Sequence, residues 1–135
     1  MATPVEGSAT TIDSVELDWS AMTTLQETGN TFSIDSYNLE LLDSSTGEWD
    51  EVVGETTSYT LLTYTLTGLT MGTNYSFRLR ASNVHGFGEY SDIVVVRADD
   101  IPGVPNSVTT TANGLSVDFA WSAPTSDNGS PITAY

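Results

Sequence analysis

The side chains that could carry chemistry in this chain are few and scattered. His85 is the only histidine among 135 residues, cysteine is absent, and all three basic residues are arginines. Nucleophilic catalysis needs a base beside a nucleophile and an orienting acid, and zinc needs several converging nitrogen or sulfur ligands. His85 lies instead in the glycine-containing segment NVHGFG at 83–88, which is typical of a loop tip. The sequence therefore predicts no catalytic residue, no cofactor and no enzyme activity within these residues.

Carboxylates are the second group that could do chemistry. The chain has 18 acidic residues against three arginines, a net charge of -15. Asp99 and Asp100 are candidate calcium ligands that could hold a cation between two domains, but no EF-hand spacing occurs and a solvated acidic surface is the favoured alternative. This charge disfavours nucleic acid and anionic membranes, because both are bound through lysine and arginine. It favours basic partners.

The elements that would position these side chains have the pattern of strands. Apolar and polar residues alternate in SVELDWS at 14–20, in IDSYNLELL at 34–42 and in NYSFRLRAS at 74–82. A period of two means that one face of each strand is buried and the other is wet, as in an antiparallel sheet. Turn-forming clusters separate these segments, and no segment combines helical periodicity with a convincing cap. The sequence predicts an all-β fold, and no apolar run approaches the length needed for membrane insertion.

An internal repeat divides the chain. SVELDWSAM at 14–22 matches SVDFAWSAP at 116–124, and SIDSY at 33–37 resembles SPITAY at 130–135. The spacing of about 100 residues is the length of one sandwich domain. We therefore expect a domain at 1–99, a short Pro/Gly linker at 100–105, and at 106–135 the truncated start of a second domain. The first match is followed by a long loop from Ser20 to Ser33.

These motifs together resemble the fibronectin type III family. Trp19 resembles the core tryptophan of strand B, and Leu69 and Tyr75 resemble the tyrosine corner, whose phenol bonds to backbone. Tyr37 aligns with Tyr135 of the second copy. The resemblance implies an immunoglobulin-like β-sandwich of seven strands in two antiparallel sheets, followed by strands A, B and the beginning of C of a partial second sandwich. Trp19, Tyr37, Leu69 and Tyr75 are the residues expected to define the fold.

Three exposed regions are candidates for interaction. The first is the F–G loop, where His85 and Phe87 would form a binding tip next to the B–C loop, unless Phe87 covers the end of the core. The second is the outward face of strand G, with an apolar pair at Ile93 and Val95. The third region comprises the apolar residues of the truncated domain, which two strands alone cannot bury: Val117, Phe119 and Trp121.

Two further features concern the surface. Arg78 and Arg80 should point outward from strand F, with Glu40 as a cross-strand partner; such exposed pairs contribute at most ~1 kcal/mol. Asn74 and Asn128 begin glycosylation sequons at or near loops, which matter only in a secreted protein.

The function expected from these features is non-catalytic. We expect a protein-interaction and spacer module of a tandem-repeat structural or adhesion protein, at the cell surface or outside the cell. The alternatives are an intracellular cytoskeletal or ciliary repeat protein, or an accessory domain of a secreted enzyme. The N-terminal residues do not resemble a signal peptide. Expected partners are other protein chains or neighbouring repeats, including self-association that completes the truncated domain.

Overall fold

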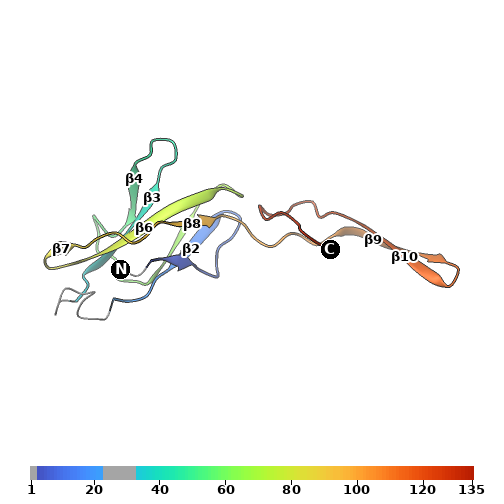
Figure 1. Cartoon of the computed structure of the whole chain (residues 1–135), viewed down its shortest axis with the longest axis horizontal. Coiled ribbons are helices and arrows are strands. Elements are labelled where there is room, and N and C mark those ends of the chain that lie inside the picture. The colour runs from blue at the N-terminus through green and yellow to red at the C-terminus, as the bar shows by residue number, and fades with distance from the viewer. Residues whose placement is uncertain (1–2, 23–32) are drawn as a thin grey trace.

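The molecule consists of a β-sandwich followed by a separate β-hairpin (Figure 1). This computed structural model describes residues 3–22 and 33–135. Every regular element in those ranges is a β-strand, which confirms the prediction of an all-β fold. The long loop predicted between Ser20 and Ser33 lies mostly outside the described residues.

The sandwich has two antiparallel sheets, as predicted. The first sheet has the strand order β1-β2-β5 and consists of β1 (Val5–Glu6), β2 (Ser14–Asp18) and β5 (Thr63–Thr67). The second has the order β4-β3-β6-β7, with β8 also paired to β6, and consists of β3 (Ser36–Leu42), β4 (Trp49–Val53), β6 (Asn74–Asn83), β7 (Gly86–Phe87) and β8 (Val94–Arg97). The two-residue strand β7 is an addition to the seven expected strands.

The core lies between these sheets and is built by the alternating residues of their strands. Val15 and Leu17 of β2 are fully buried, and Trp19 follows them. The opposite sheet contributes a larger set of buried side chains, namely Tyr37, Leu39, Phe77, Leu79, Ala81, Val96 and Ala98. Burial of each large apolar side chain stabilises the fold by about 1.5–3 kcal/mol. This packing holds the outer face of β3 and β6 in a fixed position.

Two tyrosines connect the core to the loops at its ends. The hydroxyl of Tyr75 accepts a hydrogen bond from the backbone N–H of Thr70 at 2.9 Å, which is the contact expected of a tyrosine corner. Leu69 is partly buried against the core. Tyr37 lies against Trp19, with ring centroids 5.9 Å apart, and its hydroxyl accepts from the backbone N–H of Met22 at 3.2 Å. All four fold-defining residues therefore contact the core or the loops that close it.

The tail is a hairpin of β9 (Asn106–Asn113) and β10 (Ser116–Ser122). Asn113 pairs with Ser116 across a two-residue turn, and Gly114 at its first position has a φ of 64°. Glycine is the residue that such a turn favours there, because other side chains rarely adopt positive φ. The hairpin is joined to the sandwich by a segment without strands, since β8 ends at Arg97.

Candidate functional site

The most organised group of polar side chains lies on the outer face of β3 and β6. Glu40 pairs with Arg78 in the strand register. The carboxylate of Glu40 accepts from Arg78 Nε at 2.7 Å and lies 2.6 Å from Arg78 Nη2. Its other oxygen accepts from the hydroxyl of Tyr90 at 2.6 Å. The predicted pairing of Glu40 with Arg78 is confirmed, and Tyr90 is a third partner that the alternation pattern did not predict.

Aromatic rings enclose both arginines of this face. The guanidinium carbon of Arg78 lies 4.3 Å from the ring centroid of Trp49 and 3.8 Å from that of Tyr90. The corresponding distances for Arg80 are 4.5 Å to Tyr90 and 4.1 Å to Phe87. We call these five residues, Trp49, Arg78, Tyr90, Arg80 and Phe87, the arginine ladder. Cations over aromatic faces are attracted by the ring quadrupole, by about 0.5–2 kcal/mol per contact according to desolvation.

The ladder corrects one expectation from the sequence. The pair between Arg78 and Glu40 was expected to be exposed and to contribute at most ~1 kcal/mol. The side chain of Glu40 is only 7% exposed and that of Arg78 is 24% exposed, because Tyr90 and Trp49 cover them. Arg80 donates from Nε to Asn38 Oδ1 at 2.7 Å and lies 3.3 Å from Glu55. These charges are therefore only partly hydrated, and removing one partner would leave the other poorly solvated.

The polar groups of this face are already bonded to one another. Burial raises the pKa of the Tyr90 hydroxyl, and its hydrogen bond to Glu40 raises it further. The hydroxyl is therefore held as a neutral donor, and the carboxylate it faces already accepts from an arginine. A nucleophile or base must be free to reach a substrate, so this arrangement is suited to holding the sheet surface together. Trp49 and Tyr90 could have been identified from the sequence only as aromatic residues near strands.

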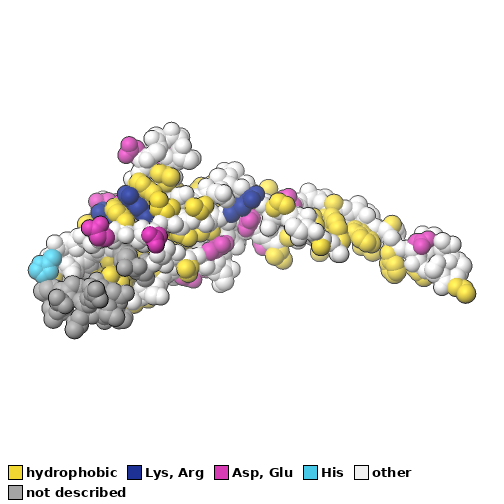
Figure 2. Space-filling model, viewed as in Figure 1, with side chains coloured by type: hydrophobic (Ala, Val, Ile, Leu, Met, Phe, Trp, Pro, Cys, Tyr) yellow, Lys and Arg dark blue, Asp and Glu magenta, His cyan; other side chains and the backbone are white. Residues whose placement is uncertain are grey.

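The loop tip at 83–87 is placed differently from the expectation for Phe87. His85 lies at the end of the sandwich remote from the tail (Figure 2), and its backbone N–H donates to Asn83 Oδ1 at 2.9 Å. Phe87 pairs with Ser82 in β7 and stacks on Arg80, so it covers the outer face and not the end of the core. The physical reason is the β7 pairing, which turns this ring onto the ladder. The B–C loop that would complete a binding tip lies largely outside the described residues.

Strand β8 presents the second candidate surface. Ile93 is 58% exposed and Val95 is 56% exposed, whereas Val96 is buried. This is the alternation that the sequence predicted for a strand with one wet face. Val95 pairs with Ser76 of β6, and Ile93 immediately precedes β8, so the two exposed residues form a small apolar stripe.

The hairpin presents the third candidate surface. Val117, Phe119 and Trp121 alternate along β10 and are 54%, 65% and 51% exposed. Figure 2 shows hydrophobic side chains running along the hairpin. The ring of Tyr135 lies 6.0 Å from that of Trp121, at an interplanar angle of 54°. In the sandwich the corresponding rings of Trp19 and Tyr37 are 5.9 Å apart at 56°.

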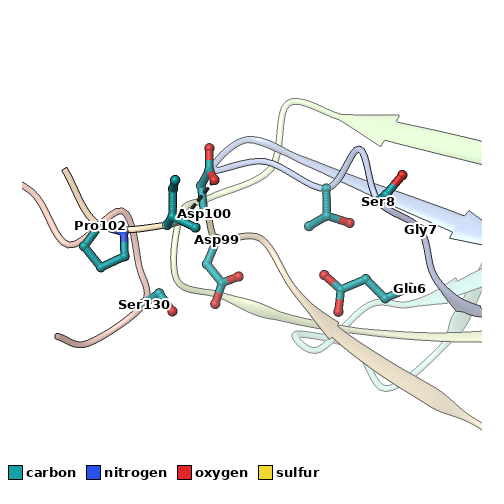
Figure 3. A pocket seen from close by; sticks show the side chains of 9 residues that line it. Glu6, Gly7, Ser8, Asp99, Asp100, Pro102 and Ser130 are labelled. Carbon is teal, nitrogen blue, oxygen red and sulfur yellow. Dashed lines mark hydrogen bonds between the residues drawn. The ribbon is translucent and has the colours of Figure 1, made fainter. Parts of the chain in front are cut away.

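An open cavity of about 310 Å³ lies where the tail leaves the sandwich. Glu6, Asp99 and Asp100 line it, together with Pro102 and Ser130 (Figure 3). The carboxylate of Asp99 lies 3.7 Å from Arg97, and that of Asp100 accepts from the backbone N–H of Ile101 at 2.7 Å. Among residues 3–22 and 33–135 no group of three or more histidine or acidic side chains is arranged to hold a metal ion. The two calcium candidates are thus near one another but directed to protein partners.

The two sequons occupy different environments. Asn74 is the exposed first residue of β6 and pairs with Arg97 of β8. Asn128 is partly buried, and its side-chain amide donates to the carbonyl of Ile101 at 2.9 Å. A glycan attached to that nitrogen would compete with this contact.

Comparison with known proteins identifies the sandwich. The family model described as "Fibronectin type III domain" matches residues 3–97. Titin module A71 from human cardiac muscle has a similar structure, with a TM-score of 0.52 and 27% identity over 67% of this chain and 81% of that one. Within the part of the chain that the structure describes, no helix has the length and hydrophobicity to cross a membrane.

Two curated relatives are much longer than this chain. The tyrosine-protein phosphatase Lar-like of Caenorhabditis elegans is 29% identical over 98% of this chain, an alignment that continues into the hairpin. The striated-muscle M-protein of Gallus gallus is 38% identical over 50% of this chain. The aligned regions span 7% and 5% of those proteins.

Proposed function

The chain belongs to the fibronectin type III family, and we propose from this that it is a non-catalytic interaction and spacer module of a tandem-repeat protein. Domains of this family in muscle proteins and in a phosphatase support a role in protein interaction. The finer part of the proposal is that residues 106–135 open a second repeat of the same kind.

One observation carries this proposal. The pair of Trp121 and Tyr135 in the tail has nearly the same centroid separation and angle as the pair of Trp19 and Tyr37 in the sandwich. In each pair, the tryptophan lies near the end of a strand with alternating apolar residues. The tyrosine lies in the segment that follows the next loop. A shared ring geometry on repeated sequence supports repeated architecture. The alignment with the Lar-like phosphatase, which runs through sandwich, linker and hairpin, adds support.

We place the module in a structural or adhesion protein at the cell surface or outside the cell. The strong acidity and the lack of lysine are in keeping with that location. The similarity to a striated-muscle protein and to a titin module favours the alternative of an intracellular repeat protein. Immunolocalisation of the full-length protein separates these two: surface labelling of intact cells supports the first, and labelling only after permeabilisation supports the second.

The proposed contact surface is the apolar face of the hairpin. In the sandwich, the equivalent residues of β2 are covered by apolar side chains of β3 and β6. The hairpin face should therefore bind a β-sheet with alternating apolar residues, and a second copy of this chain can supply one. Association of two copies through β10 would remove Phe119 and Trp121 from water.

Sedimentation velocity over a wide range of protein concentrations tests this contact. We expect a dimer that forms with increasing concentration and is lost in Trp121→Ser. The matched control is Ile93→Ser, which removes a similarly exposed apolar side chain from the residue that precedes β8 and should leave the dimer intact. A wild-type chain that stays monomeric at every concentration would rule out self-association through the hairpin.

A further inference from the structure

The joint between sandwich and hairpin is built around a tight turn. Ser130 donates its backbone N–H to the carbonyl of Asp127 at 3.0 Å. The two residues between them, Asn128 and Gly129, have positive φ values of 51° and 82°. Two consecutive positive values define a type I′ turn, for which Asn-Gly is the favoured sequence. The turn is therefore specified locally by its two central residues.

The linker is hydrogen-bonded to this turn. Asp100 donates its backbone N–H to the carbonyl of Asn128 at 3.0 Å, and the side-chain amide of Asn128 donates back to the carbonyl of Ile101 at 2.9 Å. Gly103 donates to the carbonyl of Ser126 at 3.2 Å. The sequence predicted a short Pro/Gly linker here. These bonds restrain the linker independently of its prolines.

The same turn touches the sandwich through a loop that follows β5. Gly72 in this loop donates its backbone N–H to the carbonyl of Ala98 at 2.8 Å, which ties the loop to the end of β8. A Cβ atom added to Gly129 would lie 3.0 Å from the nitrogen of Gly72, 3.1 Å from its Cα and 3.2 Å from the Cβ of Asp99. These neighbours are backbone or short side-chain atoms that cannot rotate away. Glycine is thus favoured at 129 by its φ and by the close approach, because an added Cβ would force these neighbours to shift by a few tenths of an ångström.

We propose that the loop 69–73 of the sandwich is a docking surface for a type I′ turn of the following unit, and that this contact fixes the angle between the two. The partner it fits is a turn with glycine at the second central position, because any side chain there would meet backbone. The corresponding segment of the first copy, 20–33, contains no Asn-Gly pair. The turn of the second unit therefore matches the loop 69–73. A following unit with the first copy's sequence at this segment would not dock on that loop in the same way.

This contact does not depend on the proposed function. It involves residues 69–73, 99–103 and 126–130, and it would form whichever partner covers the apolar face of the hairpin. The open cavity lined by Asp99 and Asp100 lies at the same joint (Figure 3). Gly72 and Gly129 provide the close contact there. Losing this contact should free the hairpin to swing without unfolding the sandwich.

Distance measurement by double electron–electron resonance tests the proposal on the whole chain. The chain has no cysteine, so spin labels can be placed specifically at Thr65→Cys on β5 and Thr111→Cys on β9, both exposed. We expect a single narrow distance peak in the otherwise wild-type chain and loss of that peak in Gly129→Ala. The matched control is Gly47→Ala, which has a similar φ of 78° and no atom within 4 Å of an added Cβ. This control should keep the narrow peak.

Two further readouts distinguish swinging from unfolding. Thermal unfolding of the sandwich should be unchanged in Gly129→Ala, while the amide resonance of Gly72 should shift. Asn128→Asp keeps a turn-compatible residue but removes the donor to Ile101, so it should broaden the peak. A broad distribution in the wild-type chain, or a narrow one in Gly129→Ala, would overturn the proposal. Doubly labelled chain is diluted with excess unlabelled chain, so that only distances within one copy are measured whether or not two copies associate, and sedimentation measures association separately.

Discussion

Strands β2 and β10 carry the same residue pattern and have opposite environments. Val15, Leu17 and Trp19 of the first pattern are at most 5% exposed. The matching residues of β10, Val117, Phe119 and Trp121, are all more than half exposed. The difference is the presence of a facing sheet, since β3 and β6 cover the first set. An alternating pattern thus defines a strand and its apolar face, whereas burial depends on segments distant in sequence.

The hairpin therefore contributes little to the stability of the molecule as it stands. Its two strands are held by their own ladder and by the turn at Gly114. Isolated two-stranded hairpins are marginally stable in water, because they cannot bury an apolar face. Matched substitutions in the two regions should consequently have unequal effects.

The largest difference is expected for the two tryptophans. Trp19→Ala should lower the free energy of unfolding by about 3–5 kcal/mol, because it leaves a cavity in the core. Trp121→Ala should lower it by less than about 1 kcal/mol, because the side chain is already half in water. Urea unfolding followed by circular dichroism measures both. If Trp19→Ala prevents folding, the pair Val15→Ala and Val117→Ala gives the same comparison at smaller magnitude.

Two glycines with positive φ give the next comparison. Gly54 in the sandwich has a φ of 97°, and a Cβ added there would collide with the carbonyl of Tyr37. Gly54→Ala should destabilise the fold by about 2–4 kcal/mol through backbone strain and displacement of β3. Gly114 in the hairpin has a φ of 64° and open space around it. Gly114→Ala should leave the main urea transition unchanged, and equal shifts in both variants would contradict the comparison.

Substitution of one carboxylate in each region comes third. Glu40→Gln removes the charge that faces Arg78 beneath the arginine ladder, and we expect a loss of about 1–3 kcal/mol. Asp118 of β10 accepts from the side-chain amide of Asn113 at 3.2 Å, on an exposed surface. Asp118→Asn should change stability by less than about 0.5 kcal/mol. Thermal unfolding of both variants in the same buffer checks the difference.

The smallest effect concerns alkaline pH. The pKa of Tyr90 is raised above its ordinary value of 10.0 by burial and by the hydrogen bond to Glu40. The neutral hydroxyl thus adds stability that is fully present below that value and is lost as pH rises through the higher folded value. Stability should fall more steeply above pH 10.0 in the wild-type chain than in Tyr90→Phe. An identical loss of stability at alkaline pH in both chains would show that the arginine ladder does not depend on this hydroxyl.

Much of the fold could be predicted from the sequence. The alternation in 14–20, 34–42 and 74–82 correctly predicted strands and the inward face of each. The cross-strand pair of Glu40 and Arg78 was also predicted. What the sequence could not provide was the cover over that pair, because Trp49 and Tyr90 reach it from other strands and loops. Phe87 was misplaced for the same reason, since its contact with Arg80 depends on the short β7 pairing.

The joint was likewise only partly predictable. Two prolines and a glycine between 101 and 105 indicated a short linker. The sequon that begins at Asn128 was expected at or near a loop. Their mutual hydrogen bonds and the approach of Gly129 to Gly72 depend on where the sandwich places its loops, which no local pattern encodes.

Hydrogen–deuterium exchange of the whole chain tests most directly the claim that one pattern has two environments. At a concentration where the chain is monomeric, peptides covering 14–19 should exchange only through global unfolding of the sandwich. Peptides covering 116–121 should exchange orders of magnitude faster, through local opening of an uncovered hairpin. Equal protection of the two segments in a monomer would contradict the account, because it would mean that β10 is covered by its own chain.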